Sequence, residues 1–157
     1  MLAYAIAAPA IGMADAAIDH FVGSARERLA SAGPDAAGNP HANLLIANCR
    51  TMLDCAEAKF TQNLEELGQA ARAGTEPSLD LRARCRWEAS WIAGCCASQV
   101  DAVFGAAGVG ALFDQHPLQR LFRDIHALKA HRVMNAEMTG ENFGRLQVGL
   151  ANREFFL

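Results

Sequence analysis

Apolar residues recur at intervals of three and four along most of the chain, which is the spacing of one face of an α-helix. Three breaker-rich segments interrupt this pattern: residues 31–40, residues 73–77 and the glycine-rich stretch that ends at Pro117. Long helical segments separated by short loops are usual in bundles. The pattern therefore predicts an all-α protein, an antiparallel four-helix bundle that forms a single domain over residues 1–157, with a short C-terminal tail.

Local signals place the ends of the expected helices. Pro9 lies inside the first apolar segment and should kink that helix or mark its start, because it has no N–H to donate. Ser78 is a plausible N-cap of the third helix. Pro117 occupies a favoured first position for a fourth helix that is expected to reach Ala136. The tail is expected after Gly140.

Composition supports helix and narrows the class of protein. Ala occurs 32 times, and the chain carries 14 basic and 17 acidic side chains, which gives a net charge of −3. Without a basic surplus, binding to nucleic acid is not expected. No uninterrupted apolar run is long enough to span a membrane, and the apolar N-terminus lacks the positive charge of a signal peptide. We therefore expect a cytoplasmic protein that does not bind membranes.

The five cysteines are an odd number and contain no CxxC pair. They lie in apolar segments, so we expect buried free thiols in a reducing compartment. No Cys/His cluster or HExxH pattern occurs, and no metal site is expected. Phe155, Phe156 and Leu157 would leave apolar bulk exposed at the end of the chain. Together with Trp87 and Trp91, they suggest an interface of a homo-oligomer, either a dimer or a tetramer.

One polar stripe runs along the expected fourth helix, opposite its core face. Arg120, Asp124, Ala127 and His131 lie at i, i+4, i+7 and i+11. The simpler interpretation is a solvated face with an Arg–Asp ion pair. The alternative is the wall of a site in which His131 serves as acid, base or hydrogen-bond donor.

The glycines before this helix, Gly105, Gly108 and Gly110, also allow two interpretations. They can form a helix C-cap and turn. Alternatively, the missing side chains can let the backbone approach a flavin or its phosphate closely.

Residues 105–150 resemble the C-terminal part of the acyl-CoA dehydrogenase superfamily, most specifically in PLQRLFRDIHALKAH (Pro117 to His131). The segment APAIGMADAAIDHFV (Ala8 to Val22) fits the first C-terminal helix of that family in its pattern. The resemblance is to the branch of two-component flavin-dependent monooxygenases, whose members hydroxylate aromatic compounds. It implies a reduced flavin, FMN or FAD, that is supplied by a separate flavin reductase.

The resemblance assigns roles to the candidate residues. It implies that His131 is catalytic and lies beside flavin and substrate, that Arg120 and Asp124 shape the same wall, and that Gly108 and Gly110 contact the cofactor. In acyl-CoA dehydrogenases a glutamate base follows this helix, and by the same count its position here holds Arg132, which cannot act as a base.

Members of the family also have an N-terminal helical domain and a β-barrel, which are expected to be absent here. The chain alone is therefore expected to be inactive. Two other functions remain open. One is the C-terminal domain of an acyl-CoA dehydrogenase or oxidase whose base is another residue, for which Glu57, Glu65, Glu66 and Glu88 are candidates. The other is a non-enzymatic oligomerisation bundle.

Overall fold

The computed structural model describes residues 2–33 and 38–155, and within these ranges it contains helices and turns but no strand. The long helices are α1 (Leu2–Ala32), α2 (Pro40–Arg72) and α3 (Leu79–Ala107), followed by the shorter α4 (Pro117–Lys129) and α5 (Ala136–Gln147). Two 3₁₀ turns, η1 (Val109–Leu112) and η2 (Arg132–Met134), flank α4. Phe156 and Leu157 and part of the first expected loop lie outside the described residues.

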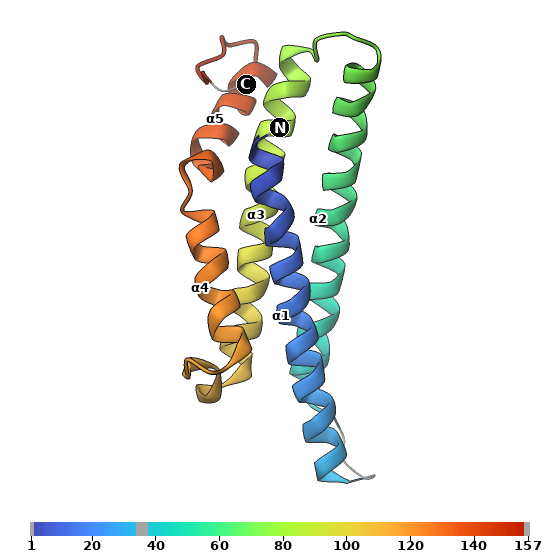
Figure 1. Cartoon of the computed structure of the whole chain (residues 1–157), viewed down its shortest axis with the longest axis vertical. Helices are drawn as coiled ribbons and strands as arrows, with labels where there is room; N and C mark the ends of the chain where they lie inside the picture. The colour runs from blue at the N-terminus through green and yellow to red at the C-terminus, as the bar shows by residue number, and fades with distance from the viewer. Residues whose placement is uncertain (1, 34–37, 156–157) are drawn as a thin grey trace.

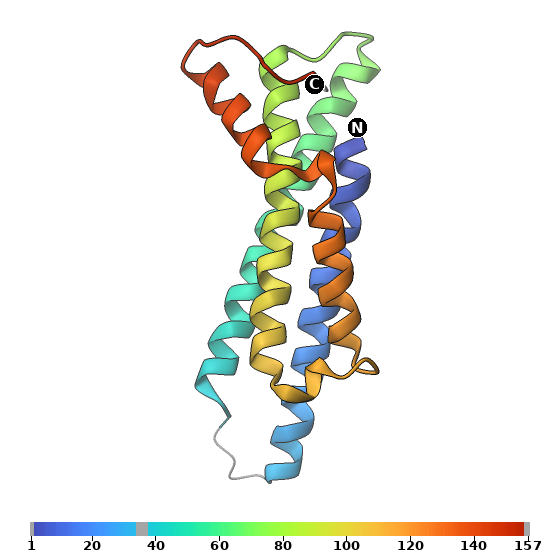
Figure 2. The same cartoon turned by 90° about the vertical axis from the view of Figure 1, so that its left-hand side faces the viewer.

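The helices form the expected antiparallel bundle, with α3 in its middle. Figures 1 and 2 show α1, α2 and α3 running side by side, while α4 and α5 follow one another along the remaining side of α3. Helix α3 packs against all of the other α-helices, most extensively against α1. This contact pattern confirms that a helix apolar on more than one face is surrounded by neighbours.

Small side chains let α1 and α3 approach each other closely. Both helices bury alanines completely, among them Ala7, Ala10 and Ala14 of α1 and Ala89 and Ala93 of α3. A methyl group fills little space between helix backbones, so packing is tight and tolerates little added volume. The many alanines therefore form much of the core as well as favouring helix.

The start signals read from the sequence are confirmed for α3 and α4. The Ser78 hydroxyl accepts a hydrogen bond from the Leu81 amide at 3.1 Å. Pro117 is the first residue of α4, and the preceding His116 accepts a hydrogen bond from the Leu118 amide through Nδ1 at 3.2 Å. Pro9 lies within α1, which begins at Leu2, so it does not mark the start of that helix.

The expectation that the fourth helix continues to Ala136 is wrong. Helix α4 ends at Lys129, the chain turns through η2, and α5 begins at Ala136. Side-chain acceptors at His131 and Asn135 cap the two new starts, and Met134 between them is buried at 3% exposure. These local hydrogen bonds and the burial of Met134 replace the backbone bonds of a continuous helix.

The tail expected after Gly140 is also wrong, because Gly140 lies inside α5. The tail begins after α5 and folds back onto it, since Asn142 Oδ1 accepts a hydrogen bond from the Arg153 amide at 2.8 Å. Glu154 forms a buried ion pair with Arg86 of α3, with 2.9 Å between Oε1 and Nε. The end of the chain is thus fixed against the bundle as far as Glu154.

Helix α1 meets the length and hydropathy criteria of a membrane-spanning helix, with a mean hydropathy of 1.3 in its most apolar window. The expectation that no segment is long and apolar enough to span a membrane therefore does not hold for α1 by these criteria. The same criteria are met by core helices, and α1 buries Ile18 and Phe21 as well as its alanines within the bundle. Within the bundle 39% of that window is buried, so packing accounts for part of the apolar character of α1.

All five cysteines are free, but their burial differs from the expectation. Cys49, Cys85 and Cys96 are buried, Cys95 is half-buried and Cys55 is exposed on α2. Burial raises the pKa of the Cys96 thiol to about 12 and also raises that of Cys85. These two thiols therefore remain protonated and unreactive at neutral pH.

Candidate functional site

His131 occupies the turn between α4 and α5. Its carbonyl accepts a hydrogen bond from the Met134 amide at 2.7 Å, and its own amide donates to Leu128 O at 3.0 Å. Its Nδ1 accepts a hydrogen bond from the Val133 amide at 3.1 Å. His131 is exposed, while Met134 in the same turn is buried and anchors it to the core.

The hydrogen bond by which His131 caps η2 determines which ring nitrogen carries the proton. A backbone amide can only donate, so Nδ1 must carry a lone pair toward Val133. In the neutral ring, the proton therefore lies on Nε2. This arrangement makes His131 a hydrogen-bond donor through Nε2–H, held in position by its own turn.

Arg120 and Asp124 come together as an ion pair on α4, with 3.3 Å between Nε and Oδ2. Both side chains are exposed, at 80% and 52%. Helix α4 ends at Lys129, two residues before His131. The helical spacing that would place His131 on the same face as this pair is therefore absent. No described contact joins His131 to either residue.

Gly108 ends α3 with a φ of +81°, a conformation that favours glycine. The turn interpretation of the glycine stretch is therefore correct. Gly108 and Gly110 are exposed, and a Cβ at either position would meet no heavy atom within 4 Å. This open backbone is compatible with the approach of a flat group such as a flavin, but it provides only one edge of a binding site.

The sequence did not predict a contact between His126 and Asp101. His126 Nε2 lies 2.7 Å from Asp101 Oδ1, which joins α4 to α3. The His126 ring also contacts Phe122 edge-on, and Phe122 stacks on Phe104 with centroids 4.5 Å apart. Asp101 and His126 are 25 residues apart, so no local spacing links them. This cluster positions α4 on α3.

Two of the glutamates considered as alternative bases are held between α2 and α3. Glu88 accepts a hydrogen bond from the buried Asn63 at 2.7 Å and pairs with Lys59 at 3.6 Å. Glu66 pairs with Arg84, which lowers the pKa of the Glu66 carboxyl. Glu57 and Glu65 are exposed. The ion pairs of Glu66 and Glu88 fasten the two helices to each other.

Comparisons with known proteins agree with this architecture. The chain is 33% identical over 149 residues to the oxygenase subunit HsaA of a flavin-dependent monooxygenase from Mycobacterium tuberculosis, covering 92% of this chain and 37% of the relative. It is equally similar to HsaA from Rhodococcus jostii, over 92% of this chain and 38% of the relative. The chain thus spans less than half the length of these relatives.

Solved structures show the same fold. The crystal structure of the HsaA monooxygenase from M. tuberculosis matches with a TM-score of 0.90 at 30% identity, covering 100% of this chain and 40% of that one. The 3-HSA hydroxylase from Rhodococcus sp. RHA1 matches with a TM-score of 0.92 at 29% identity, covering 99% of this chain and 40% of that one.

The family described as "Acyl-CoA dehydrogenase, C-terminal domain" matches residues 4–136, which include most of α1, all of α2 to α4 and the turn that carries His131. This match covers most of the chain, and the relatives and solved structures named above extend the similarity over nearly all of it. The chain therefore belongs to the family of acyl-CoA dehydrogenase C-terminal domains.

Proposed function

We propose that these 157 residues serve as the C-terminal domain of the oxygenase component of a two-component flavin-dependent monooxygenase that hydroxylates an aromatic substrate. The observation that carries this proposal is the 33% identity to HsaA oxygenase subunits over 92% of the chain. Because the chain spans only 37–38% of those relatives, the remainder of the catalytic site would come from protein outside these residues.

In this proposal His131 is the residue that contacts the substrate. Its ring caps η2 through Nδ1, which leaves Nε2–H free to donate from a turn that Met134 anchors. A donor in this position can bind a phenolic oxygen and orient the aromatic ring for attack. Arg120 and Asp124 would shape the adjoining surface, although they are exposed in the described structure.

Gly108 and Gly110 are the residues proposed to contact the flavin, because their backbone is open. A bound reduced flavin would supply the activation of O₂ that oxygen transfer requires. The role of the protein at this edge is to let the cofactor come close and to leave no side chain in its path. A separate flavin reductase is the proposed source of the reduced cofactor, and the cytoplasm is the proposed location.

The experiment uses a chimera in which these 157 residues replace the aligned C-terminal segment of R. jostii HsaA. His131→Asn keeps a side-chain oxygen that can cap Val133 but removes Nε2–H. We expect aromatic hydroxylation to fall by about 100-fold, within the range for a positioned proton-transfer or hydrogen-bonding group, with more H₂O₂ released per flavin oxidised. His131→Ala should act similarly.

His116→Asn is the matched control, since His116 makes the same type of cap at the start of α4. It should leave hydroxylation and coupling unchanged. Unchanged coupling in His131→Asn would refute the role of His131. Oxidation of acyl-CoA by the chimera without a reductase would refute the monooxygenase assignment. If the chimera fails to fold, the same substitutions at the aligned positions of R. jostii HsaA provide the readout.

A further inference from the structure

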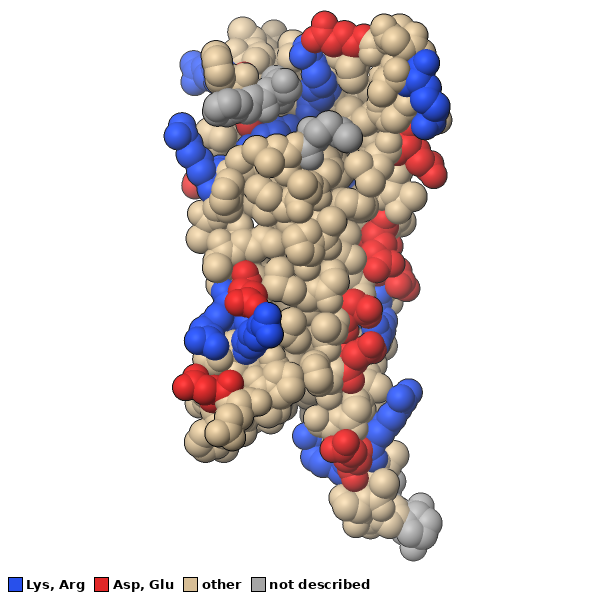
Figure 3. All heavy atoms as spheres, viewed as in Figure 1, with Lys and Arg blue, Asp and Glu red and all other residues tan. Residues whose placement is uncertain are grey.

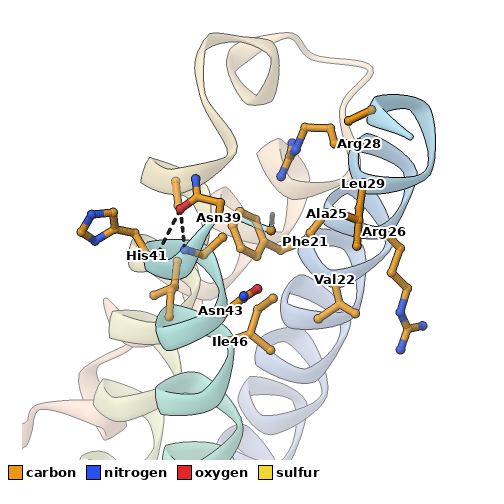
Figure 4. Close-up of a pocket in the computed structure, with 15 residues that line it drawn as sticks. Phe21, Val22, Ala25, Arg26, Arg28, Leu29, Asn39, His41, Asn43 and Ile46 are labelled. Carbon is orange, nitrogen blue, oxygen red and sulfur yellow. Dashed lines mark hydrogen bonds between the residues drawn. The ribbon is translucent and has the colours of Figure 1, made fainter. Parts of the chain in front are cut away.

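The turn that carries His131 directly follows α4, so the contacts that fix the end of α4 also fix the His131 ring. Core packing does not close the bundle at every helix end. Val22 and Leu29 of α1 face Ile46 of α2 across an apolar groove of about 760 Å³ at the ends of those two helices (Figure 4). The end of α4 therefore has to be examined for contacts of its own.

The charged outer face of α4 does not fasten it to a neighbour. Figure 3 shows acidic and basic side chains beside one another over α4. The ion pair of Arg120 with Asp124 joins two residues of the same helix. A pair of this kind supports its own helix but does not connect it to another.

The contact that connects the last turn of α4 to α3 is made by His126. Its Nε2 lies 2.7 Å from Asp101 Oδ1 of α3. A carboxylate oxygen can only accept, so Nε2–H donates to Asp101. The His126 ring also packs edge-on against Phe122, which stacks on Phe104 of α3. The ring is therefore held both by a hydrogen bond and by an aromatic contact.

The backbone of His126 also closes the helix. Its carbonyl accepts a hydrogen bond from the Ala130 amide at 3.0 Å, immediately before His131. On the other side of His131, the buried Met134 attaches the turn to the core. His131 thus lies between two attachments, the Asp101–His126 hydrogen bond before it and Met134 after it.

We propose that Asp101 is a positioning residue for the hydroxylation reaction: it holds the His126 ring, which fixes the end of α4 and thereby the Nε2–H donor of His131. This inference rests on the function proposed above. The side chains of His126 and Asp101 are 38% and 45% exposed, and exposed pairs contribute little to overall stability. A misplacement of about 1 Å at a reacting group, in contrast, can lower a rate by about 100-fold. Loss of Asp101 should therefore affect the reaction more than folding.

The HsaA chimera tests this proposal with Asp101→Ala, which removes the acceptor and introduces the best helix former. We expect kcat for hydroxylation to fall by about tenfold with little change in KM, and more H₂O₂ to be released per flavin oxidised. The melting temperature should change by less than about 3 °C. Asp101→Asn keeps an oxygen that can accept from Nε2–H and should recover most of the lost turnover.

Asp15→Ala is the matched control. Asp15 of α1 also joins two helices, through Arg50 of α2 at 2.6 Å, and its side chain is 49% exposed. Its replacement should leave turnover and coupling unchanged. If Asp101 acts through His131, Asp101→Ala should cause no further loss in a His131→Asn background, whereas a general weakening of the fold would lower turnover in both backgrounds.

Hydrogen exchange in the isolated 157-residue chain tests the positioning without any activity. Asp101→Ala should speed exchange of the Ala130 and His131 amides by about twofold or more, and Asp15→Ala should not. Unchanged coupling or unchanged exchange in Asp101→Ala would overturn the proposal. So would a further loss in the His131→Asn background, or an Asp101→Asn variant that recovers no turnover. A folded parent chimera that does not hydroxylate would instead count against the proposed function, and exchange alone would then decide whether Asp101 fixes the turn.

Discussion

Gly140 of α5 lies directly against the indole ring of Trp87 of α3: a Cβ at Gly140 would be 2.8 Å from Cζ3 of that ring. Trp87 lies on the central helix of the bundle and is half-buried there. The missing side chain at Gly140 thus sets how closely α5 approaches α3. This contact explains why a glycine is present in the middle of a helix, where it is otherwise unfavourable.

Gly140→Ala should destabilise the protein. The added methyl group overlaps the Trp87 ring, and we expect the free energy of unfolding to fall by about 1–3 kcal/mol. Gly144→Ala is the control, since a Cβ there meets nothing within 4 Å on the same helix. That variant should be more stable by about 0.5–1 kcal/mol. Urea unfolding followed by tryptophan fluorescence measures both, and a Gly140→Ala variant as stable as Gly144→Ala would contradict the prediction.

Enlarging a buried alanine in the central helix should be costly. Ala93 of α3 is fully buried, so Ala93→Leu forces its neighbours apart, and we expect a loss of about 1–3 kcal/mol. Ala102→Leu adds the same volume at an exposed position of α3 and should change stability by less than about 0.5 kcal/mol. Thermal unfolding compares the two variants. Equal melting temperatures would show that the α3 packing is loose.

Stability should depend on pH through Glu154. Burial raises the pKa of its carboxyl, and the Arg86 guanidinium opposes the rise. A carboxyl with a raised pKa binds its proton more tightly in the folded state. The stabilisation that the Glu154 carboxyl contributes is therefore fully present below its pKa in the unfolded chain. It is lost as the pH rises through the pKa of this carboxyl in the folded state. The unfolding free energy of the unchanged protein minus that of Glu154→Gln should thus fall as the pH rises above 4.5, the ordinary pKa of a glutamate.

Urea unfolding at several pH values measures this difference. Glu141→Gln serves as the control, because Glu141 is 55% exposed in its pair with Arg145. The control should lack the downward trend. A difference that grows with pH would mean that the attraction of Arg86 outweighs the burial of Glu154.

The 157-residue chain by itself should not bind reduced FMN or FAD with micromolar affinity. Gly108 and Gly110 offer an open edge with no heavy atom near either Cβ position, and His131 is exposed at a turn. Such an edge cannot enclose a flavin as ligand sites usually do. Anaerobic titration followed by absorbance and fluorescence provides the measurement. Saturable micromolar binding would show that these residues form a more complete site than the structure indicates.

The sequence predicts the pairing of Arg120 with Asp124 correctly, but it does not predict where His131 lies. Arg120 and Asp124 form the helical pair that their i, i+4 spacing predicts. The expectation that His131 lies on the same helix rests on the helical spacing of apolar residues as far as Val133 and Ala136. That assignment was wrong because capping at His131 and Asn135 and the burial of Met134 end α4 earlier. The role of His131 in catalysis remains a prediction.

By itself, the sequence determined the helical class, the three long helices and the starts of α3 and α4, because helical periodicity and capping are local properties that a few neighbouring residues specify. The tertiary structure alone decided the break between α4 and α5, the contact of Gly140 with Trp87 and the pairing of His126 with Asp101. The last two depend on residues that are far apart in the sequence and are brought together by packing, and the break depends on the burial of Met134 in the core as well as on the local caps at His131 and Asn135.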